Sequence, residues 1–411
     1  MDVSQSQRLQ AALAPLSGVG ADYVLPDYAG RGLFNLAVSL ARVCGASVPP
    51  EYADLLLADG RRASAAWERF PTLVFFLVDG MGDLMLHRNR DVAPNLWRHR
   101  QQAITSVFPS TTATAITTLM TAEPAAVHGL LGWFVRDERS GQIVAPLPMR
   151  HRTGGPVTDT GIVDRLLRVE PMLARARRKP AFVTLPELAE GPYARRHGAA
   201  ASVWTYPELT ELTAAVMRAV NGADGAGFVY AYTPLLDATA HDHGIDSAAV
   251  REVLARVDQC FVELCERLPQ ALVVATADHG FIDCPESRCI DLAAHRQLYA
   301  MLRAPLSGER RAAYCHVKPQ YVETFGAAVM AELGHAVLAV RTREARAAGL
   351  FGPGVPVTVE DPAGDWILIA RDDWTVRDVL PGENAYRMIG VHGGLTPQEM
   401  RVPLVVREPA D

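Results

Sequence analysis

Short apolar runs that recur along the chain most constrain how it folds. The clearest runs from Thr72 to Val78 (TLVFFLV) and ends in Asp-Gly-Met-Gly. A continuous apolar run of this length is typical of a strand buried on both faces, as in a parallel sheet. Four similar runs follow: Ala181 to Leu185 (AFVTL), Ala201 to Tyr206 (ASVWTY), Phe228 to Tyr232 (FVYAY) and Ala271 to Thr276 (ALVVAT).

Helical patterns lie between these runs. Apolar residues recur at helical spacing from Pro207 to Val220 and again from Ser247 to Leu268. Strands that alternate with helices indicate βαβ units. We therefore predict an α/β fold with a mostly parallel central sheet flanked by helices.

Three parts of the chain are expected. Residues 1–70 indicate helices and loops packed on the core, and residues 71–289 and 386–411 carry the α/β pattern. Residues 290–385 differ, with the polar stretch SGERRAAY, an Ala-rich helical stretch and a Gly/Pro break, before the chain returns to a motif like the earlier ones. We therefore expect 290–385 to form a smaller inserted cap subdomain.

Charge, composition and the N-terminal sequence indicate where the protein is located in the cell and which partners it does not bind. Forty basic and forty-six acidic residues give a net charge of -6, which argues against binding long nucleic acids. The N-terminus has no basic stretch followed by an apolar core, and nine of the twenty-two residues from 101 to 122 are Ser or Thr, which disfavours a membrane span there. Six cysteines are sparse, with no CxxC pair. We expect a cytoplasmic protein with no membrane partner; its oligomeric state is left open.

Asp and His residues follow the apolar runs. Asp79 follows the first run, Asp237 and His241 follow FVYAY, Asp278 and His279 follow ALVVAT, and His392 stands in GVHGG near the C-terminus. In open parallel sheets, ligands bind beyond the carboxyl ends of the strands. Asp and His without Cys suit zinc or a related divalent metal, and six such residues suffice for two metals. Taken singly, each pattern is also typical of a helix N-cap, a turn or a solvated helix face.

The segment from Phe108 to Ala122 (FPSTTATAITTLMTA) is the candidate for the nucleophile. It is rich in hydroxyl groups and turns apolar at helical spacing after Pro109. One interpretation makes Ser110 the N-cap of a helix with a Thr-rich first turn. The other places a Thr hydroxyl at a helix N-terminus that holds an anion, where metal coordination activates it.

In order and spacing, these motifs resemble the alkaline phosphatase superfamily, in its nucleotide pyrophosphatase/phosphodiesterase branch. VDGMG, Pro-Ser-Thr-Thr, the stretch TAEPAAVHGL, Asp237-x-x-x-His241, Asp278-His279 and His392 follow one another as in that branch. The resemblance extends from about Leu73 to Leu404 and implies an alkaline-phosphatase-like sandwich. It also implies that two Zn²⁺ are bound, one by Asp79, Asp278, His279 and the nucleophile, the other by Asp237, His241 and His392.

Within the same resemblance, two motif counts place the nucleophile at Thr112, with Thr111 as the alternative. Two departures concern the substrate. Trp133 stands where family members have an Asn that helps to hold the phosphoryl oxygens, and Ala115 and Ile116 replace an Asn-His pair. The resemblance therefore supports the family's metal ligands in this chain better than it supports the family's substrate. Trp133 becomes a candidate substrate contact.

The implied reaction is in-line displacement at phosphorus by Thr112, followed by hydrolysis of phospho-threonine. A phosphodiesterase acting on small phosphate esters is the preferred interpretation, because Trp133, Phe134 and Met149 offer apolar surface for a second ester group, although they are equally typical of a core. Arg150 and His151 are possible phosphate contacts. The alternatives are a phosphomonoesterase, a phosphonate hydrolase or a non-catalytic metal-binding protein. A sulfatase is disfavoured because PSTTAT lacks the C/S-x-P-x-R context.

Overall fold

The central feature of the molecule is a seven-stranded sheet with the order β2-β18-β9-β1-β8-β6-β7. The computed structural model describes residues 23–222, 225–354, 361–381, 383 and 387–409. Neighbouring strands from β9 to β7 run parallel, and only β18 is antiparallel to its neighbours. The strands of this sheet are β1 (Leu73–Val78), β2 (Arg100–Thr105), β6 (Pro180–Thr184), β7 (Ser202–Thr205), β8 (Phe228–Thr233), β9 (Leu272–Thr276) and β18 (Arg401–Arg407).

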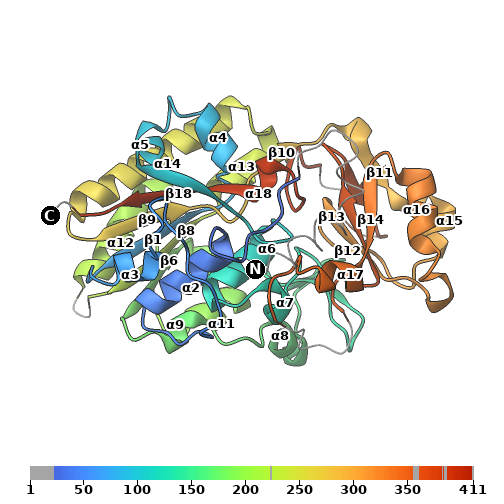
Figure 1. The fold of residues 1–411 in the computed structure, drawn as a ribbon, viewed down its shortest axis with the longest axis horizontal. Helices are drawn as coiled ribbons and strands as arrows, with labels where there is room; N and C mark the ends of the chain where they lie inside the picture. Colours follow the sequence, from blue (N-terminus) through green and yellow to red (C-terminus); the bar gives the residue numbers. More distant parts are fainter. Residues whose placement is uncertain (1–22, 223–224, 355–360, 382, 384–386, 410–411) are drawn as a thin grey trace.

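Helices cover both faces of this sheet, which explains why its inner strands are apolar throughout. Every residue of β1, β8 and β9 is buried. In Figure 1, α4 (Asp83–Arg88), α5 (Pro94–His99), α13 (Leu235–His243) and α14 (Ala248–Arg267) lie on one side of the sheet, and α2 (Leu33–Val43), α9 (Met172–Arg175) and α11 (Pro192–Gly198) lie on the other. The five strands predicted from apolar runs are all present, so the predicted α/β class with a mostly parallel sheet is confirmed.

The start of helix α14 follows from its sequence. In α14, the Ser247 hydroxyl accepts a hydrogen bond from the Val250 N–H and caps the helix, and its buried residues recur at helical spacing. The helices up to residue 267, together with α18 near the C-terminus, are α2 (Leu33–Val43), α3 (Ala63–Trp67), α4 (Asp83–Arg88), α5 (Pro94–His99), α6 (Thr112–Thr121), α7 (Ala125–His128), α8 (Thr160–Leu166), α9 (Met172–Arg175), α10 (Pro186–Ala189), α11 (Pro192–Gly198), α12 (Leu212–Asn221), α13 (Leu235–His243), α14 (Ala248–Arg267) and α18 (Pro397–Met400).

A second sheet lies in the region where the cap was expected. It is four-stranded and antiparallel, with the order β12-β13-β15-β14. Its strands are β12 (Ser307–Gly308), β13 (Ala312–Cys315), β14 (Val337–Arg341) and β15 (Trp366–Ala370), with β11 (Cys289–Asp291) paired to β16 (Thr375–Arg377) and helices α15 (Arg296–Ala300), α16 (Phe325–Leu333) and α17 (Thr342–Ala347) beside them. These elements stand apart from the central sheet on one side of the molecule (Figure 1).

The second sheet has an apolar core of its own, and a further cluster joins it to the rest. One cluster, which includes Phe325 and Leu368, draws only on residues between 290 and 376. Another packs Phe108 and Leu131 against Ile367 and Ile369 of β15. The division at residues 70, 289 and 385 stays a prediction, and residues 1–22 and 384–386 lie outside the described residues.

Three short ladders complete the fold. They pair β3 (Val135–Arg136) with β4 (Ile143–Ala145), β4 with β5 (Arg150–His151), and β10 (Ile282–Asp283) with β17 (Gly390–Val391). The hydroxyl-rich run from 101 to 122 divides into β2, a turn and α6. Across the described ranges, no helix has the length and apolarity that spanning a membrane requires.

Candidate active site

The carboxyl ends of β1, β8 and β9 bring the first Asp and His residues together. The three strands are neighbours in register, with Val78 opposite Thr233 and Leu77 opposite Thr276. Asp79 follows β1 directly, and Asp278 with His279 follow β9. The turn after Asp79 is tight, because Gly80 has a φ of +76° and a Cβ there would lie 2.4 Å from the Phe281 ring.

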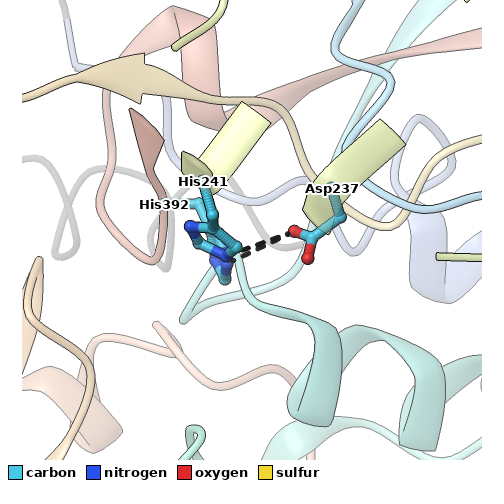
Figure 2. Close-up of side chains that lie close together, drawn as sticks. All are labelled: Asp237, His241 and His392. Atoms are coloured by element: carbon cyan, nitrogen blue, oxygen red, sulfur yellow. Dashed lines mark ion pairs between the residues drawn. The ribbon is translucent and has the colours of Figure 1, made fainter. Parts of the chain in front are cut away.

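The remaining candidates come from α13 and from the strand pair β10–β17. Asp237 and His241 lie one turn apart in α13, as their spacing predicted. His392 follows β17, which pairs with the β10 strand just after His279. Figure 2 shows both imidazoles facing the Asp237 carboxylate; the distances from Asp237 Oδ1 are 3.5 Å to His241 Nε2 and 3.7 Å to His392 Nε2.

His279 lies at the centre of the cluster. Its Nε2 atom is 3.3 Å from Asp79 Oδ1, 3.5 Å from Asp278 Oδ2 and 3.9 Å from Asp237 Oδ1. The Thr112 hydroxyl lies 3.1 Å from the same nitrogen. The structure therefore brings all seven predicted ligand and nucleophile residues into one cluster.

The imidazole rings are oriented alike. The Nδ1 atoms of His241, His279 and His392 lie 2.8, 3.0 and 3.3 Å from the backbone carbonyl oxygens of Gly390, Gly280 and Ser110. Because a carbonyl oxygen only accepts, each Nδ1 carries the proton in the neutral ring, and Nε2 is left with an unprotonated lone pair, which in His279 accepts from the Thr112 hydroxyl. Each Nε2 faces the carboxylates, which is how metal-binding histidines are held.

Three carboxylate oxygens in the same cluster have no hydrogen-bond donor among the residues that the structure describes. They are Oδ1 of Asp79, Oδ1 of Asp237 and Oδ2 of Asp278, all of them buried. Buried polar atoms without a partner are rare in folded proteins and call for an explanation such as an ion. Three carboxylates and three lone-pair nitrogens form a donor set that fits divalent cations.

The pKa values of these groups move in the directions that burial without a cation produces. Burial raises the pKa of Asp79 to about 6, and burial together with the Asp79 charge raises that of Asp278 to about 8. Burial and the same neighbouring carboxylates raise the pKa of Asp237 well above its usual value. Burial lowers the pKa of His241 to about 4 and lowers that of His392 as well. Neutral imidazoles are the form that binds metal.

Two groups of donor atoms lie close enough to hold an ion. One consists of Asp237, His241 and His392, and the other of Asp79, Asp237 and His279, with the donor atoms of each group within 4.8 Å of one another. The first group is one of the two expected zinc sets. In the second, Asp237 takes the place expected for Asp278, so the division of ligands between two metals stays a prediction.

Of the consecutive hydroxyls at the start of α6, only that of Thr112 contacts the cluster. Thr112 is the first residue of the helix, and Thr111 is its N-cap, although the Thr111 side chain makes no capping bond. Instead the Thr111 hydroxyl donates to Glu309 Oε1 at 2.6 Å, and the Ser110 hydroxyl donates to the Gly394 carbonyl at 2.8 Å. The alternative interpretation of Ser110 as the N-cap is therefore wrong, because its side chain is bonded elsewhere.

A cavity of about 450 Å³ opens from this cluster towards the second sheet. Trp133 and Phe134 line it, and the Trp133 side chain is 38% exposed. Met149 belongs to the core instead. Arg150 and His151 are not among the described residues that line the cavity, whereas the next residue, Arg152, is.

Several residues of the site escaped the sequence analysis. The Tyr232 hydroxyl donates to Asp79 Oδ2 at 2.5 Å, and Glu309 accepts bonds from the Thr111 hydroxyl and, at 2.5 Å, from the Trp133 N–H. Burial raises the pKa of Glu309 to about 7. The only sequence signal for Glu309 was the polar stretch SGERRAAY, whose place beside α6 depends on how two sheets pack.

Comparison with known proteins finds a matching family and several similar folds. Residues 73–395 match the model of the family described as type I phosphodiesterase / nucleotide pyrophosphatase. Murine ectonucleotide pyrophosphatase / phosphodiesterase 5 has a similar fold, with a TM-score of 0.62 and 17% identity over 82% of this chain and 88% of that chain. Its inactive threonine-to-alanine variant in complex with AMP gives 0.61 and 18% over the same shares.

A second kind of solved structure has a similar fold. Phosphonoacetate hydrolase from Sinorhizobium meliloti 1021, in complex with phosphonoformate, gives a TM-score of 0.59 and 18% identity over 85% of this chain and 92% of that chain. No curated protein matches the sequence significantly.

The fold and the family match define a class: enzymes of the alkaline phosphatase superfamily, which have an α/β fold and hydrolyse phosphoric esters. Within it, the chain belongs to the type I phosphodiesterase / nucleotide pyrophosphatase family, because the family model spans most of its length. The resemblance that the motifs indicated is thereby confirmed.

Proposed function

We propose that the protein is a two-metal phosphodiesterase in which Thr112 is the nucleophile. The observation that carries this proposal is the convergence of three Nε2 lone pairs and three carboxylate oxygens, which lack a donor among the described residues, beside one threonine hydroxyl. In this proposal Asp79, Asp278, His279 and Thr112 hold one divalent ion, and Asp237, His241 and His392 hold the other. Zinc is the preferred metal, because Asp and His are ligands that it favours.

Two bound cations would supply the positive charge that stabilises phosphoryl transfer. The chain's own residues position the reactants. The Thr112 oxygen attacks phosphorus, the bond from phosphorus to the leaving oxygen breaks, and water then hydrolyses phospho-threonine to restore the hydroxyl. Thr112 opens the ten-residue helix α6, whose N-terminal N–H groups favour the anionic phosphoryl group.

Features of this chain and of its relatives support a diester substrate. The cavity beside Thr112 has exposed apolar side chains, Trp133 and Val379, that suit a second ester group. In the murine relative, a threonine-to-alanine variant is described as inactive and binds AMP, which is consistent with a threonine nucleophile and a nucleotide-like ligand. The relative that binds phosphonoformate favours phosphonate hydrolysis as the second candidate.

The test compares Thr112→Ala with Thr111→Ala in zinc-loaded protein. We expect Thr112→Ala to lower the kcat for bis-p-nitrophenyl phosphate by about 10³-fold or more, because loss of a nucleophile leaves only binding and electrostatic catalysis. Thr111→Ala, which loses only the bond to Glu309, should keep the phospho-threonine pathway. Full activity in Thr112→Ala would assign the nucleophile elsewhere.

The same preparations separate the remaining functions. Faster turnover of p-nitrophenyl phosphate than of the diester would favour a phosphomonoesterase, and cleavage of phosphonoacetate alone would favour a phosphonate hydrolase. Two equivalents of bound metal without turnover of any of these compounds would favour the non-catalytic metal-binding protein. The cytoplasmic location expected from the sequence stays a prediction.

A further inference from the structure

The turn between β12 and β13 brings Glu309 to the start of α6. Gly308 before it has a φ of +84°, and the Glu309 N–H donates to the Ala312 carbonyl at 3.0 Å, which closes the turn. Gly308 also pairs with Phe134 through two backbone hydrogen bonds of 2.6 and 3.2 Å. Backbone contacts on both sides therefore fix the place of Glu309 in the wall of the cavity that Thr112 also lines.

One oxygen of Glu309 accepts two hydrogen bonds. The Thr111 hydroxyl donates to Oε1 at 2.6 Å, and the Trp133 N–H donates to the same atom at 2.5 Å. A carboxyl group accepts both bonds through this oxygen whether or not its other oxygen carries a proton. The arrangement therefore depends on where the acceptor lies and does not require a charge on Glu309.

The bond to Glu309 sets the direction of the Thr111 side chain. Thr111 is the N-cap of α6, where a threonine hydroxyl ordinarily accepts from the N–H of the second or third helical residue. Those residues are Ala113 and Thr114, and the Thr111 side chain makes no capping bond. Its hydroxyl, which is fully buried, is directed at Glu309 instead.

The first turn of α6 is therefore left without a side-chain cap. The first backbone hydrogen bond of the helix joins the Ala115 N–H to the Thr111 carbonyl at 2.9 Å. The N–H groups of Thr112, Ala113 and Thr114 precede this bond and have no intrahelical acceptor. They belong to the turn that begins with the proposed nucleophile, and such groups bind anionic oxygens.

From these contacts we propose that Glu309 is a positioning residue for the reaction, because it holds the Thr111 hydroxyl away from α6 and leaves the first-turn N–H groups to the phosphoryl oxygens. The proposal rests on the proposed function, since it concerns the phosphoryl group that Thr112 attacks. Trp133 depends less on Glu309, because the Phe134–Gly308 pairing also holds its loop.

Two substitutions of Glu309 test the proposal. Glu309→Ala lets the Thr111 hydroxyl cap α6, so kcat/KM for bis-p-nitrophenyl phosphate should fall by about 10- to 100-fold, the loss of one hydrogen bond to a charged group. Glu309→Gln keeps an oxygen that accepts both bonds, so its kcat/KM should stay near the wild-type value.

The matched control is Glu123→Ala, which should also keep the wild-type kcat/KM. Glu123 is a half-buried acceptor bonded to the Tyr52 hydroxyl at 2.7 Å, and it is not among the described residues that line the cavity. Thermal melting checks that each variant is folded. If Glu309→Ala does not fold, Glu309→Leu replaces it, since leucine keeps most of the volume and supplies no acceptor.

A second-site substitution distinguishes positioning from a general loss of structure. Thr111→Ala removes the hydroxyl that would cap the helix, so the double variant Glu309→Ala/Thr111→Ala should recover most of the activity that Glu309→Ala loses. A structural role alone predicts no recovery, because the double variant makes fewer contacts. Wild-type kcat/KM in Glu309→Ala, an equal loss in Glu309→Gln, or no recovery in the double variant would overturn the proposal.

Phosphate binding separates this proposal from the proposed function. Calorimetric titration of inorganic phosphate into the zinc-loaded variants measures the site without turnover. An affinity that falls by about 10-fold or more in Glu309→Ala and recovers in the double variant supports the proposal even if no ester is hydrolysed. If esters are hydrolysed and phosphate binds equally to the wild type and Glu309→Ala, the proposed function stands and the role of Glu309 does not. If no ester is hydrolysed and phosphate binding is unchanged, both fall.

Discussion

At the scale of single residues, the position of Asp79 depends on a tyrosine that no motif identified. The Tyr232 hydroxyl donates to Asp79 Oδ2 and leaves Oδ1 directed at His279. Both groups are buried, so the bond fixes which carboxylate oxygen points into the cluster. Such bonds to ligating carboxylates orient them for a metal.

Tyr232→Phe should therefore weaken metal binding without unfolding the protein. We expect the dissociation constant for zinc to rise by about 10- to 100-fold, the usual cost of losing a partner of a ligand. Competition with a chromophoric chelator measures the dissociation constant, and kcat at saturating zinc should change less. The control is Tyr193→Phe, which removes a buried hydroxyl bonded to Thr117 in α6. Equal zinc affinities in the two variants would contradict this role of Tyr232.

At the scale of elements, one buried ion pair joins the second sheet to the loop that carries His392. Arg311 of the β12–β13 turn donates from Nε and Nη2 to the two oxygens of Glu399, at 3.0 and 2.8 Å, and both side chains are fully buried. Glu399 also accepts the Gly394 N–H and completes the capping box of α18 with Thr396. The pair thus ties β13, α18 and the loop after His392 together.

Removing one member of this pair should lower the free energy of unfolding. Arg311→Met leaves the Glu399 charge buried without its cation, for which we expect a loss of about 3–5 kcal/mol in the free energy of unfolding. Urea denaturation gives this value. The control is Arg69→Met at the surface pair of Arg69 with Glu408, where we expect less than about 1 kcal/mol. A loss in Arg311→Met no larger than in the control would show that the pair does not stabilise the fold.

At the scale of the whole molecule, the sequence predicted those features that depend on local pattern. The apolar runs that form β1, β8 and β9 predicted the parallel sheet. Because parallel strands end at one edge of a sheet, the Asp and His residues that come after these strands were predicted to lie together. The i, i+4 spacing of Asp237 and His241 placed both on α13.

Features that depend on contacts between distant segments left no local signal. Glu309 and Arg310 reach the site only because the second sheet packs beside α6, and the residue that lines the cavity is Arg152, one residue beyond β5, rather than Arg150. Neither packing nor side-chain direction at a strand end follows from periodicity. The residues that line the cavity therefore needed the structure, whereas the cluster of Asp and His residues was predicted from the sequence.

The stability of the whole molecule should depend on pH in a way that reveals the ion site. In metal-free protein, Asp278 has a pKa of about 8 in the folded state, against 3.8 when exposed. Between these values the folded state binds more protons, so the free energy of unfolding falls as pH rises, by up to about 1.4 kcal/mol per pH unit for each such group. The buried histidines act in the opposite sense only below their ordinary pKa of 6.5.

From pH 6.5 to 8, the carboxyls therefore set the sign, and chelated protein should lose stability as pH rises. Bound zinc compensates the ionised carboxylates, so the zinc-loaded protein should be more stable and should lose this slope, because the cation replaces the protons. Urea unfolding at both pH values, with and without zinc, measures the effect. Asp278→Asn cannot ionise, so its metal-free form should show a smaller slope than the wild type. Chelated wild-type protein that is as stable at pH 8 as at pH 6.5 would mean that the folded structure does not hold these carboxyls protonated, and the case for a cation between them would lose its electrostatic support.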